Sequence, residues 1–211
     1  MADPRPDAAI DQLMGTSAET IGGIRQWWLR GVTDDDHRRA LAGGMAECRR
    51  IHQMRRHLPA PSADIVTRAF DPERDSMDWL RVNATAFAAH PDQGSWVRAD
   101  LSSRLDERWV DLDGFLVHDG PDGHLDAFCW TKVHTAPEPL GEIYVIGVDP
   151  PAAGRGLGRA IVLAGLADLH HRRGQRDAML YVESDNLVAV GLYRSLGFEV
   201  HHDDAAYEPG Q

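Results

Sequence analysis

The stretch from Val145 to Ala160, which reads VIGVDPPAAGRGLGRA, constrains the fold of this chain more than any other. An apolar run ends at a proline-marked turn, glycine then occupies every second position from 154 to 158, and a helical pattern follows. Glycine lets backbone N–H groups approach a ligand closely, and the N-terminus of a helix carries partial positive charge. The order of strand, glycine turn and helix therefore predicts a binding site for an oxygen-rich anion.

The composition is that of a soluble globular protein and argues against several kinds of partner. The 211 residues are 43% hydrophobic and 26% charged, which is enough for one good core. The formal net charge of −11 argues against nucleic acid, because phosphate neutralisation needs a basic surface. No apolar run approaches the roughly 18 residues of a membrane helix, and no signal-peptide pattern is present. We therefore expect a cytoplasmic protein with no membrane partner.

The two cysteines, Cys48 and Cys129, suggest neither a disulfide framework nor a metal site. Neither has the spacing to other cysteine or histidine residues that metal ligands show. We expect no metal.

Hydrophobic periodicity and turn residues predict alternating strands and helices, after a polar segment over residues 1–20 that we expect to be a frayed tail or a short helix. The expected strands cover 24–30, 48–58, 64–70, 114–118, 125–133, 142–148, 178–182 and 198–201, with another near 205–207, and the expected helices cover 34–41, 72–90, 97–108, 156–171 and 186–196. In the helix after Pro72, helical spacing predicts that Met77, Leu80, Ala84 and Phe87 form the buried face.

Three motifs occur in an order that resembles the GCN5-related N-acetyltransferase (GNAT) superfamily. They are VDPPAAGRGLGRA from Val148, the segment from Asn186 to Tyr193, and Leu196-Gly197-Phe198. The resemblance covers about residues 63–208. It implies an α/β fold with a splayed mixed sheet of six or seven strands and flanking helices, and acetyl-CoA as the acetyl donor.

The same resemblance implies which residues bind coenzyme A. Backbone groups of Ile146, Gly147 and Val148 would bond the pantetheine arm. Asn186 and Val190 would also line it. The pyrophosphate would lie on the turn formed by Ala153, Gly154, Arg155, Gly156, Leu157, Gly158 and Arg159. Many members carry Gln or Arg where this chain has Ala153, so we expect one side-chain contact fewer and weaker binding.

A closer resemblance is to the catalytic half of the mycothiol synthase family. It is carried by residues 86–94, 130–134, 141–150 and 180–186. That family uses acetyl-CoA to acetylate the cysteinyl amine of a glucosamine–inositol conjugate, desacetylmycothiol. The acceptor contacts that this implies are Asp92, Lys132, Glu142 and Tyr181. Asp92 stands where the family usually has glutamate, so its shorter side chain would reach less far.

Two residues are candidates for proton transfer. Glu142 begins an apolar strand, where a carboxylate is unfavourable unless it is paired or lies in a cleft. The pattern alone also allows a solvated strand end, and the resemblance makes Glu142 the general base. Tyr193 follows the 178–182 strand, on a helix. A half-buried core tyrosine is the commoner outcome there, and the resemblance makes it the acid that protonates the departing thiolate. For His134, two residues after Lys132, a loop histidine without a role is expected.

The expected organisation is a tail over 1–22, a strand–helix–strand remnant of an N-terminal domain over 23–60, and a catalytic domain over 61–211. The remnant would be a candidate surface for a homodimer, with Trp27 and Trp28 as contacts. We expect direct transfer to a small amine acceptor, because neither cysteine lies in the matched motifs. Two alternatives stay open: an acetyltransferase for another small amine, an aminosugar or a peptide N-terminus, or a CoA-binding module without catalysis.

Overall fold

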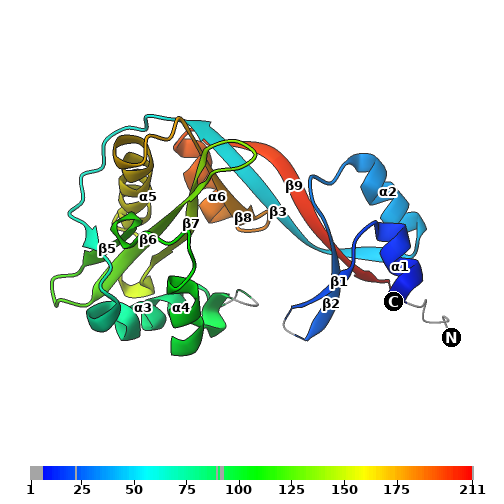
Figure 1. The fold of residues 1–211 in the computed structure, drawn as a ribbon, viewed down its shortest axis with the longest axis horizontal. Coiled ribbons are helices and arrows are strands. Elements are labelled where there is room, and N and C mark those ends of the chain that lie inside the picture. The colour runs from blue at the N-terminus through cyan, green and yellow to red at the C-terminus, as the bar shows by residue number, and fades with distance from the viewer. Residues whose placement is uncertain (1–6, 22, 89, 91–92, 211) are drawn as a thin grey trace. The chain divides into compact units, whose positions relative to one another are not determined.

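The computed structural model describes residues 7–21, 23–88, 90 and 93–210, which build one mixed sheet with flanking helices (Figure 1). Nine strands follow one another in the order β1-β2-β9-β3-β8-β7-β6-β5-β4. The α/β class is confirmed. Six of these strands, β4 to β9, lie after residue 60, and three precede them.

The chain divides into two compact units. A larger unit comprises residues 55–180 and 195–198, and a smaller unit comprises 1–54, 181–194 and 199–211. The C-terminal segments thus belong to the same unit as the N-terminal ones. The predicted domain boundaries at 22 and 60 stay predictions.

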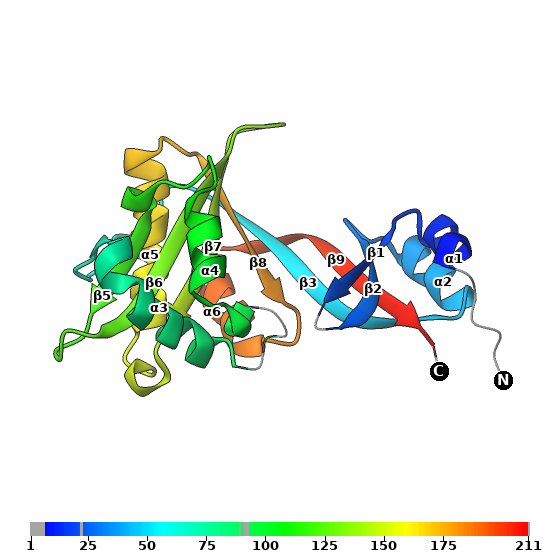
Figure 2. The same ribbon diagram turned by 60° about the horizontal axis from the view of Figure 1, so that its bottom comes forward.

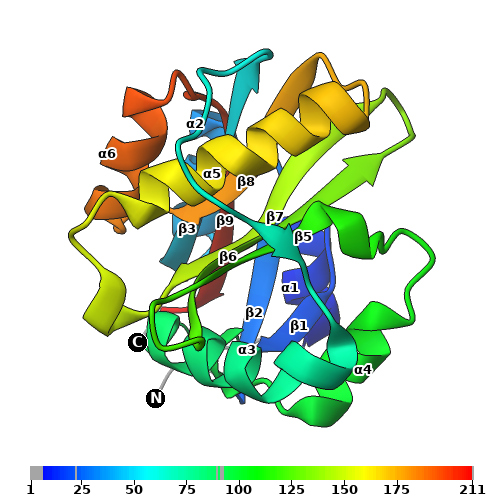
Figure 3. The same cartoon turned by 90° about the vertical axis from the view of Figure 1, so that its left-hand side faces the viewer.

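The larger unit is a sheet between helices. Its elements are β4 (Arg68–Ala69), α3 (Pro72–Ala86), α4 (Arg98–Leu105), β5 (Phe115–Asp119), β6 (Leu125–His134), β7 (Leu140–Val148), α5 (Leu157–Ala167) and the first part of β8 (Asp177–Glu183). Short 3₁₀ turns lie at Gln93–Ser95, Leu112–Gly114 and Pro150–Ala152, and a π-type turn follows α5 at Asp168–Arg172. Helix α5 covers one face of β6 and β7, and α3 covers the other (Figure 3).

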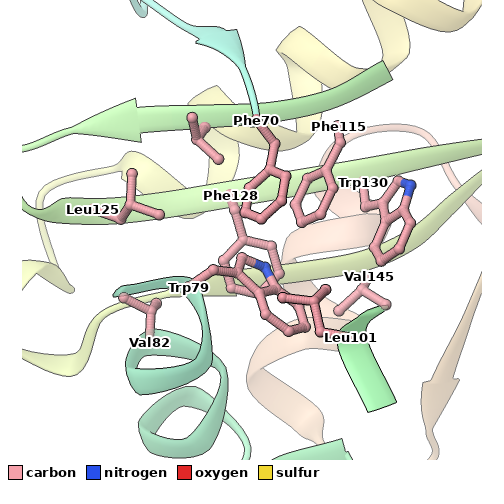
Figure 4. Close-up of a cluster of buried hydrophobic side chains, with 10 residues drawn as sticks. Phe70, Trp79, Val82, Leu101, Phe115, Leu125, Phe128, Trp130 and Val145 are labelled. Carbon is pink, nitrogen blue, oxygen red and sulfur yellow. The ribbon is translucent and has the colours of Figure 1, made fainter. Parts of the chain in front are cut away.

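An aromatic cluster fills the space between this sheet and α3 (Figure 4). The ring of Phe115 stacks on Phe70 at 4.2 Å and on Trp130 at 4.3 Å between centroids. Trp79 of α3 meets Phe115 and Phe128 edge-on or tilted. Such packing adds to the area that the rings bury, so the β5–β6 hairpin and α3 form one rigid support.

The predicted buried face of α3 is wrong at Met77, which is 65% exposed, and at Ala84, which is also exposed, while Trp79 and Val82 are buried. The polar residues Asp75 and Asn83 are buried instead. Asp75 accepts two hydrogen bonds from Arg68, at 2.6 and 2.9 Å, and Asn83 donates to the Gln93 carbonyl. Because these polar groups are satisfied, they can occupy the inner face that the hydrophobic pattern gave to Met77.

The smaller unit contains α1 (Asp7–Met14), β1 (Ala18–Ile21), β2 (Ile24–Leu29), α2 (Asp34–Ala42), most of β3 (Met45–His57), most of α6 (Leu187–Ser195) and β9 (Glu199–Pro209). Thr33 begins α2 with a capping box that includes Asp36. Figure 2 shows α1 and α2 beside these strands. Their core contains Met14, Trp27 and Tyr207.

The tryptophans predicted as dimer contacts are buried within their own unit. Trp27 is 1% exposed and Trp28 is 7% exposed. Trp27 donates to Asp11, and two arginine side chains lie over the ring of Trp28. These two side chains are therefore not a surface for a second subunit.

Two strand predictions differ from the structure. The strand expected over 64–70 is only the two-residue β4. The two strands expected near 198–201 and 205–207 form the single strand β9. The polar residues that suggested an interruption are paired within the sheet, since Asp203 accepts from Arg50 and Asp204 from Arg30.

Candidate active site

Strand β7 positions the candidate site because it pairs with β6 over a longer stretch than it pairs with β8. It pairs with β6 along most of its course, antiparallel. Its parallel ladder with β8 contains two pairs among the described residues, Gly141 with Ala178 and Glu142 with Met179. Beyond Glu142, the backbone of β7 on that side has no strand partner in this ladder. Ile146, Gly147 and Val148, the predicted pantetheine contacts, therefore lie on the part of β7 that pairs with β6 but not with β8.

A β-bulge at Tyr144 reverses which side chains face each layer. In β6, Trp130 pairs with Val145 and Thr131 pairs with Ile143, which leaves Tyr144 as the extra residue. Ile143 lies against Gly165 of α5, whereas Val145 belongs to the aromatic cluster on the α3 side. Bulges of this kind re-aim side chains and are common beside active sites.

Glu142 is buried with one hydrogen-bonding partner. It is 6% exposed, and its Oε2 lies 2.6 Å from Nε2 of His134. The register places Lys132 directly opposite Glu142 and His134 two residues further along β6. Since diagonal neighbours on adjacent strands are within reach of long side chains, the pairing follows from the register. A solvated strand end, the alternative to a base, is contradicted by this burial.

Lys132 lies on aromatic rings. Its Nζ is 4.6 Å from the ring centroid of Trp109 and 5.3 Å from that of Tyr144. In the part of the chain that the structure describes, Lys132 forms no ion pair. Burial raises the pKa of Tyr144 above its usual value, although the nearby Arg104 opposes this. Tyr144 therefore meets Lys132 as a neutral ring, and the cation–π contacts hold the ammonium over Trp109 and Tyr144.

The glycine turn has the geometry of an anion cradle. Gly154 and Gly156 adopt φ of +79° and +81°, which L-residues with side chains rarely adopt, and Gly156 precedes the first turn of α5. A Cβ at either position would meet nothing within 4 Å, so the space around both is open. Residues 153–156 are exposed. The Ala153 N–H donates to the Pro150 carbonyl at 3.1 Å, whereas Gly154 and Gly156 open onto free space just before a helix N-terminus.

The two arginines of the turn are held by neighbours. Arg155 donates to Asp126 at 2.9 Å and to the Ala152 carbonyl at 3.2 Å, and Arg159 donates to Ser195 at 3.0 Å. A surface hollow of about 340 Å³ lies beside the turn. It is lined by His118, Asp119, Gly120, Pro121, Asp126, Arg155 and Leu157.

Four predicted site residues belong to the smaller unit. Asn186 caps α6 by accepting from the Ala189 N–H at 3.1 Å. Val190 and Tyr193 of α6 are buried. Tyr181 is 43% exposed, and its hydroxyl accepts from Gln53 Nε2 at 2.7 Å. Asp92 lies outside the described residues. The structure therefore pairs Glu142 with Lys132 on adjacent strands and places the glycine turn in the same unit, after the other end of β7. The parts predicted for Tyr193, Tyr181, Asn186, Val190 and Asp92 stay predictions.

Cys129 is a fully buried thiol, and Cys48 is half-buried. Burial raises the pKa of Cys129, which is fully buried, and also raises the pKa of Cys48. A reactive cysteine has a lowered pKa and access to solvent. Both observations disfavour an acyl-cysteine intermediate.

The described residues contain neither a metal-binding cluster nor a membrane-spanning helix. No group of three or more His, Cys, Asp or Glu side chains is arranged to hold a metal. Within the same described ranges, every helix is too short or too polar to cross a bilayer.

Sequence reasoning missed His134, Trp109 and the bulge at Tyr144. His134 follows Lys132 by two residues, so strand alternation placed both on one face. The contact with Glu142 also depends on the β6–β7 register, which the local sequence pattern does not specify. Trp109 comes from a loop more than twenty residues before Lys132.

Comparison with known proteins identifies a family. The model of the Acetyltransferase (GNAT) family matches residues 71–198. The chain is 46% identical over 187 residues to "Mycothiol acetyltransferase" of Salinispora arenicola, covering 85% of this chain and 61% of that protein. It is 45% identical over 216 residues to the protein of the same name from Mycolicibacterium vanbaalenii, covering 96% of this chain and 71% of that protein. The chain thus spans less than two thirds of the length of the Salinispora relative.

Solved structures share the fold. A GCN5-related N-acetyltransferase from Sphaerobacter thermophilus superposes with a TM-score of 0.70 at 26% identity, covering 88% of this chain and 60% of that one. A tandem GNAT protein from the clavulanic acid biosynthesis pathway superposes with a TM-score of 0.58 at 17% identity, covering 90% and 61%. At that identity the second similarity concerns the fold alone.

Proposed function

Because this chain belongs to the acetyltransferase (GNAT) family, we propose that it transfers an acetyl group from acetyl-CoA to a primary amine, and that this amine is the cysteinyl amine of desacetylmycothiol. The observation that carries the proposal is Glu142, a buried carboxylate at the point where the β7–β8 ladder ends. This position suits a general base, because the acceptor amine would enter at the point where β7 and β8 stop pairing. The names of the relatives support the acceptor.

The glycine turn fits the diphosphate of acetyl-CoA. Two positive-φ glycines with open space beside them and the N-terminus of α5 supply N–H donors and partial positive charge. The unpaired edge of β7 supplies backbone groups for the pantetheine arm. Ala153 adds no side-chain donor, so binding would depend on the backbone.

The reaction that we propose is direct. Glu142 accepts a proton from the acceptor's ammonium group, and the free amine attacks the thioester carbonyl. The tetrahedral intermediate then expels the CoA thiolate, and Tyr193 would protonate it. Lys132 would contact the acceptor through a polar or anionic group. The raised pKa of both cysteine thiols supports a route without an acyl-enzyme.

The test is acetyl transfer to chemically prepared desacetylmycothiol, followed by mass spectrometry. The acceptor carries its own thiol, so a thiol-reactive dye cannot report CoA release cleanly. We expect a product heavier by one acetyl group. Glucosaminyl-inositol, which lacks the cysteine, is the matched acceptor control. Acetylation of the control but not of desacetylmycothiol would refute the acceptor, and turnover of neither with any amine would refute the activity.

A second candidate acceptor is another small amine, an aminosugar or a peptide N-terminus. The match covers 61% of the length of the Salinispora relative, so the acceptor in that relative's name is supported by part of its length. A panel of aminosugars and dipeptides at fixed acetyl-CoA tests this, since a specificity constant above that for desacetylmycothiol would replace the first candidate. CoA binding without turnover of any amine would instead favour a non-catalytic CoA-binding module.

A further inference from the structure

The acetylation of an ammonium group releases a proton that has to leave the site. One proton from the nitrogen ends on the CoA thiol, and the other is in excess. The proposed base Glu142 is 6% exposed, so it has little direct contact with solvent. On the basis of the proposed function, we propose that His134 orients Glu142 and conducts this excess proton from its carboxyl group to water.

The geometry of the pair supports this role. Nε2 of His134 lies 2.6 Å from Oε2 of Glu142, a short distance for a nitrogen–oxygen hydrogen bond. The side chain of Glu142 is 8% exposed and that of His134 is 31% exposed. The imidazole thus spans the distance from a buried carboxylate to solvent.

This pair differs from other histidine–carboxylate pairs in the chain. Asp203 is 24% exposed as a side chain and binds Arg50 as well as His52. Asp177, the partner of His57, is 44% exposed. Among the described residues, Glu142 has His134 as its one hydrogen-bond partner. The His202–Asp204 pair has similar exposures, 30% and 1%, but its contact is 3.4 Å and Asp204 also accepts from Arg30 and from the Gly31 N–H.

Charged and titratable groups lie around the pair on several elements. Lys132 is paired with Glu142 in the β6–β7 ladder, and its ammonium group lies over the ring of Trp109. Tyr144 of β7 is neutral because burial raises its pKa, and Arg104 of α4 lies over its ring. Glu107 contributes negative charge near Tyr144. The β8 residue paired with Glu142 is the apolar Met179, so β8 offers Glu142 no second proton acceptor at this position.

The proton transfer is balanced in three steps. The ammonium nitrogen gives a proton to Glu142, which becomes a neutral carboxylic acid. At the start, Nε2–H of His134 donates to the ionised carboxylate, so Nε2 has to be freed first. The ring turns to solvent, where water takes the proton from Nε2 and returns one to Nδ1, and the ring then turns back. The carboxylic acid gives its proton to the freed Nε2 as Nδ1 releases its own proton to water, which restores the starting pair. Imidazole is suited to this relay because its protonation changes between about pH 5 and 8.

The experiment replaces His134 with Gln, which keeps a hydrogen-bonding amide but does not titrate. We measure kcat with desacetylmycothiol from pH 6 to 9, at rising concentrations of imidazole. We expect kcat to fall on the order of 10- to 100-fold, with the dissociation constant for CoA unchanged. Added imidazole should restore a large part of kcat, because a small buffer replaces the missing relay.

His52→Gln is the matched control, since it removes another histidine–carboxylate pair with a 2.7 Å contact in the smaller unit. The His52→Gln variant should keep the wild-type kcat, and added imidazole should not change that kcat. His134→Asn is a second variant with a shorter amide, and a solvent deuterium isotope effect on the wild-type enzyme needs no variant at all. An isotope effect on kcat of about one would overturn the relay.

The outcomes separate this inference from the proposed function. If the wild-type enzyme is active and Glu142→Gln is not, but His134→Gln stays within twofold of wild type across the pH range, the relay is wrong and the base stands. A loss of activity that imidazole does not restore also contradicts the relay. If the wild-type enzyme acetylates no amine, the proposed function itself fails.

Discussion

Replacing Gly156 with Ala should weaken CoA binding by more than it destabilises the fold. Gly156 has φ of +81° and ψ of 1°. A non-glycine residue in the left-handed region loses about 1–2 kcal/mol. A Cβ there meets no atom within 4 Å, so no clash adds to this value. For a chain of this size, the loss corresponds to a fall in melting temperature of roughly 2–8 °C.

The added methyl group should also occupy space that we assign to the diphosphate. We expect the dissociation constant of CoA to rise at least tenfold, which corresponds to about 1.4 kcal/mol. Isothermal titration calorimetry with CoA measures this, and differential scanning calorimetry measures the melting temperature of the same sample.

Gly174→Ala is the control for strain alone. Gly174 has φ of +66°, and a Cβ there also meets nothing within 4 Å, but it lies after the π-type turn rather than before α5. Both variants should lose similar stability, and only Gly156→Ala should lose CoA affinity. Equal CoA affinity in the two variants would refute the assignment of the glycine turn to the diphosphate.

Three further predictions concern the base, the lysine and an internal ion pair. Glu142→Gln should lower kcat about 10²–10⁴-fold without changing CoA affinity, measured by product mass and calorimetry; full activity would exclude Glu142 as the base. Lys132→Met should raise KM for the acceptor about tenfold while KM for acetyl-CoA stays constant, since a charged hydrogen bond contributes about 1.5–3 kcal/mol. An unchanged acceptor KM would remove Lys132 from that site. Arg68→Met should destabilise the fold by about 3 kcal/mol in urea, because buried Asp75 loses the two hydrogen bonds from Arg68 and keeps the one from the Asp71 N–H and the longer contact with Arg74. Hydrogen bonding from Arg68 lowers the pKa of Asp119. The stabilisation from the Arg68–Asp119 pair is therefore fully present above the usual aspartate pKa of about 4. It is lost as the pH falls through the lowered pKa that Asp119 has in the folded protein. An acid transition that is the same in wild type and in Arg68→Met would contradict this assignment.

The sequence predicted those parts of the fold that local signals determine. The apolar run of β7, the turn between β5 and β6 and the glycine turn before α5 all lie where they were expected. Each has a short-range cause: hydrophobic continuity, turn residues, or glycines at positions that need positive φ. Alternation predicted the strand–helix–strand order of β2, α2 and β3 in the same way.

Long-range pairing accounts for most of the errors. Asp75 is buried because Arg68, seven residues earlier, binds it, and this turns Met77 of α3 outward. Strand β9 continues through Asp203 because Arg50, from a distant strand, satisfies the carboxylate. A hydrophobicity pattern that treats every polar residue as exposed does not detect these ion-pair partners.

The same contrast between local signals and long-range pairing applies to the candidate site. Glu142 was identified because a carboxylate in an apolar strand needs a partner, but the partner, His134, depends on register across a seven-residue gap. The bulge at Tyr144 adds one residue to β7 without any glycine to mark it. The residues assigned to the smaller unit, including Tyr193, depend on the arrangement of separate segments that no local pattern contains.

Lys132 is the only lysine in 211 residues, and it lies against Trp109 and Tyr144. An amine-reactive label therefore has a single ε-amino group in this chain to modify, apart from the N-terminus. Because Lys132 is also a proposed acceptor contact, bound acceptor should slow its modification, and mass spectrometry of the labelled chain would measure that protection. The single lysine thus makes amine labelling a direct measure of acceptor occupancy.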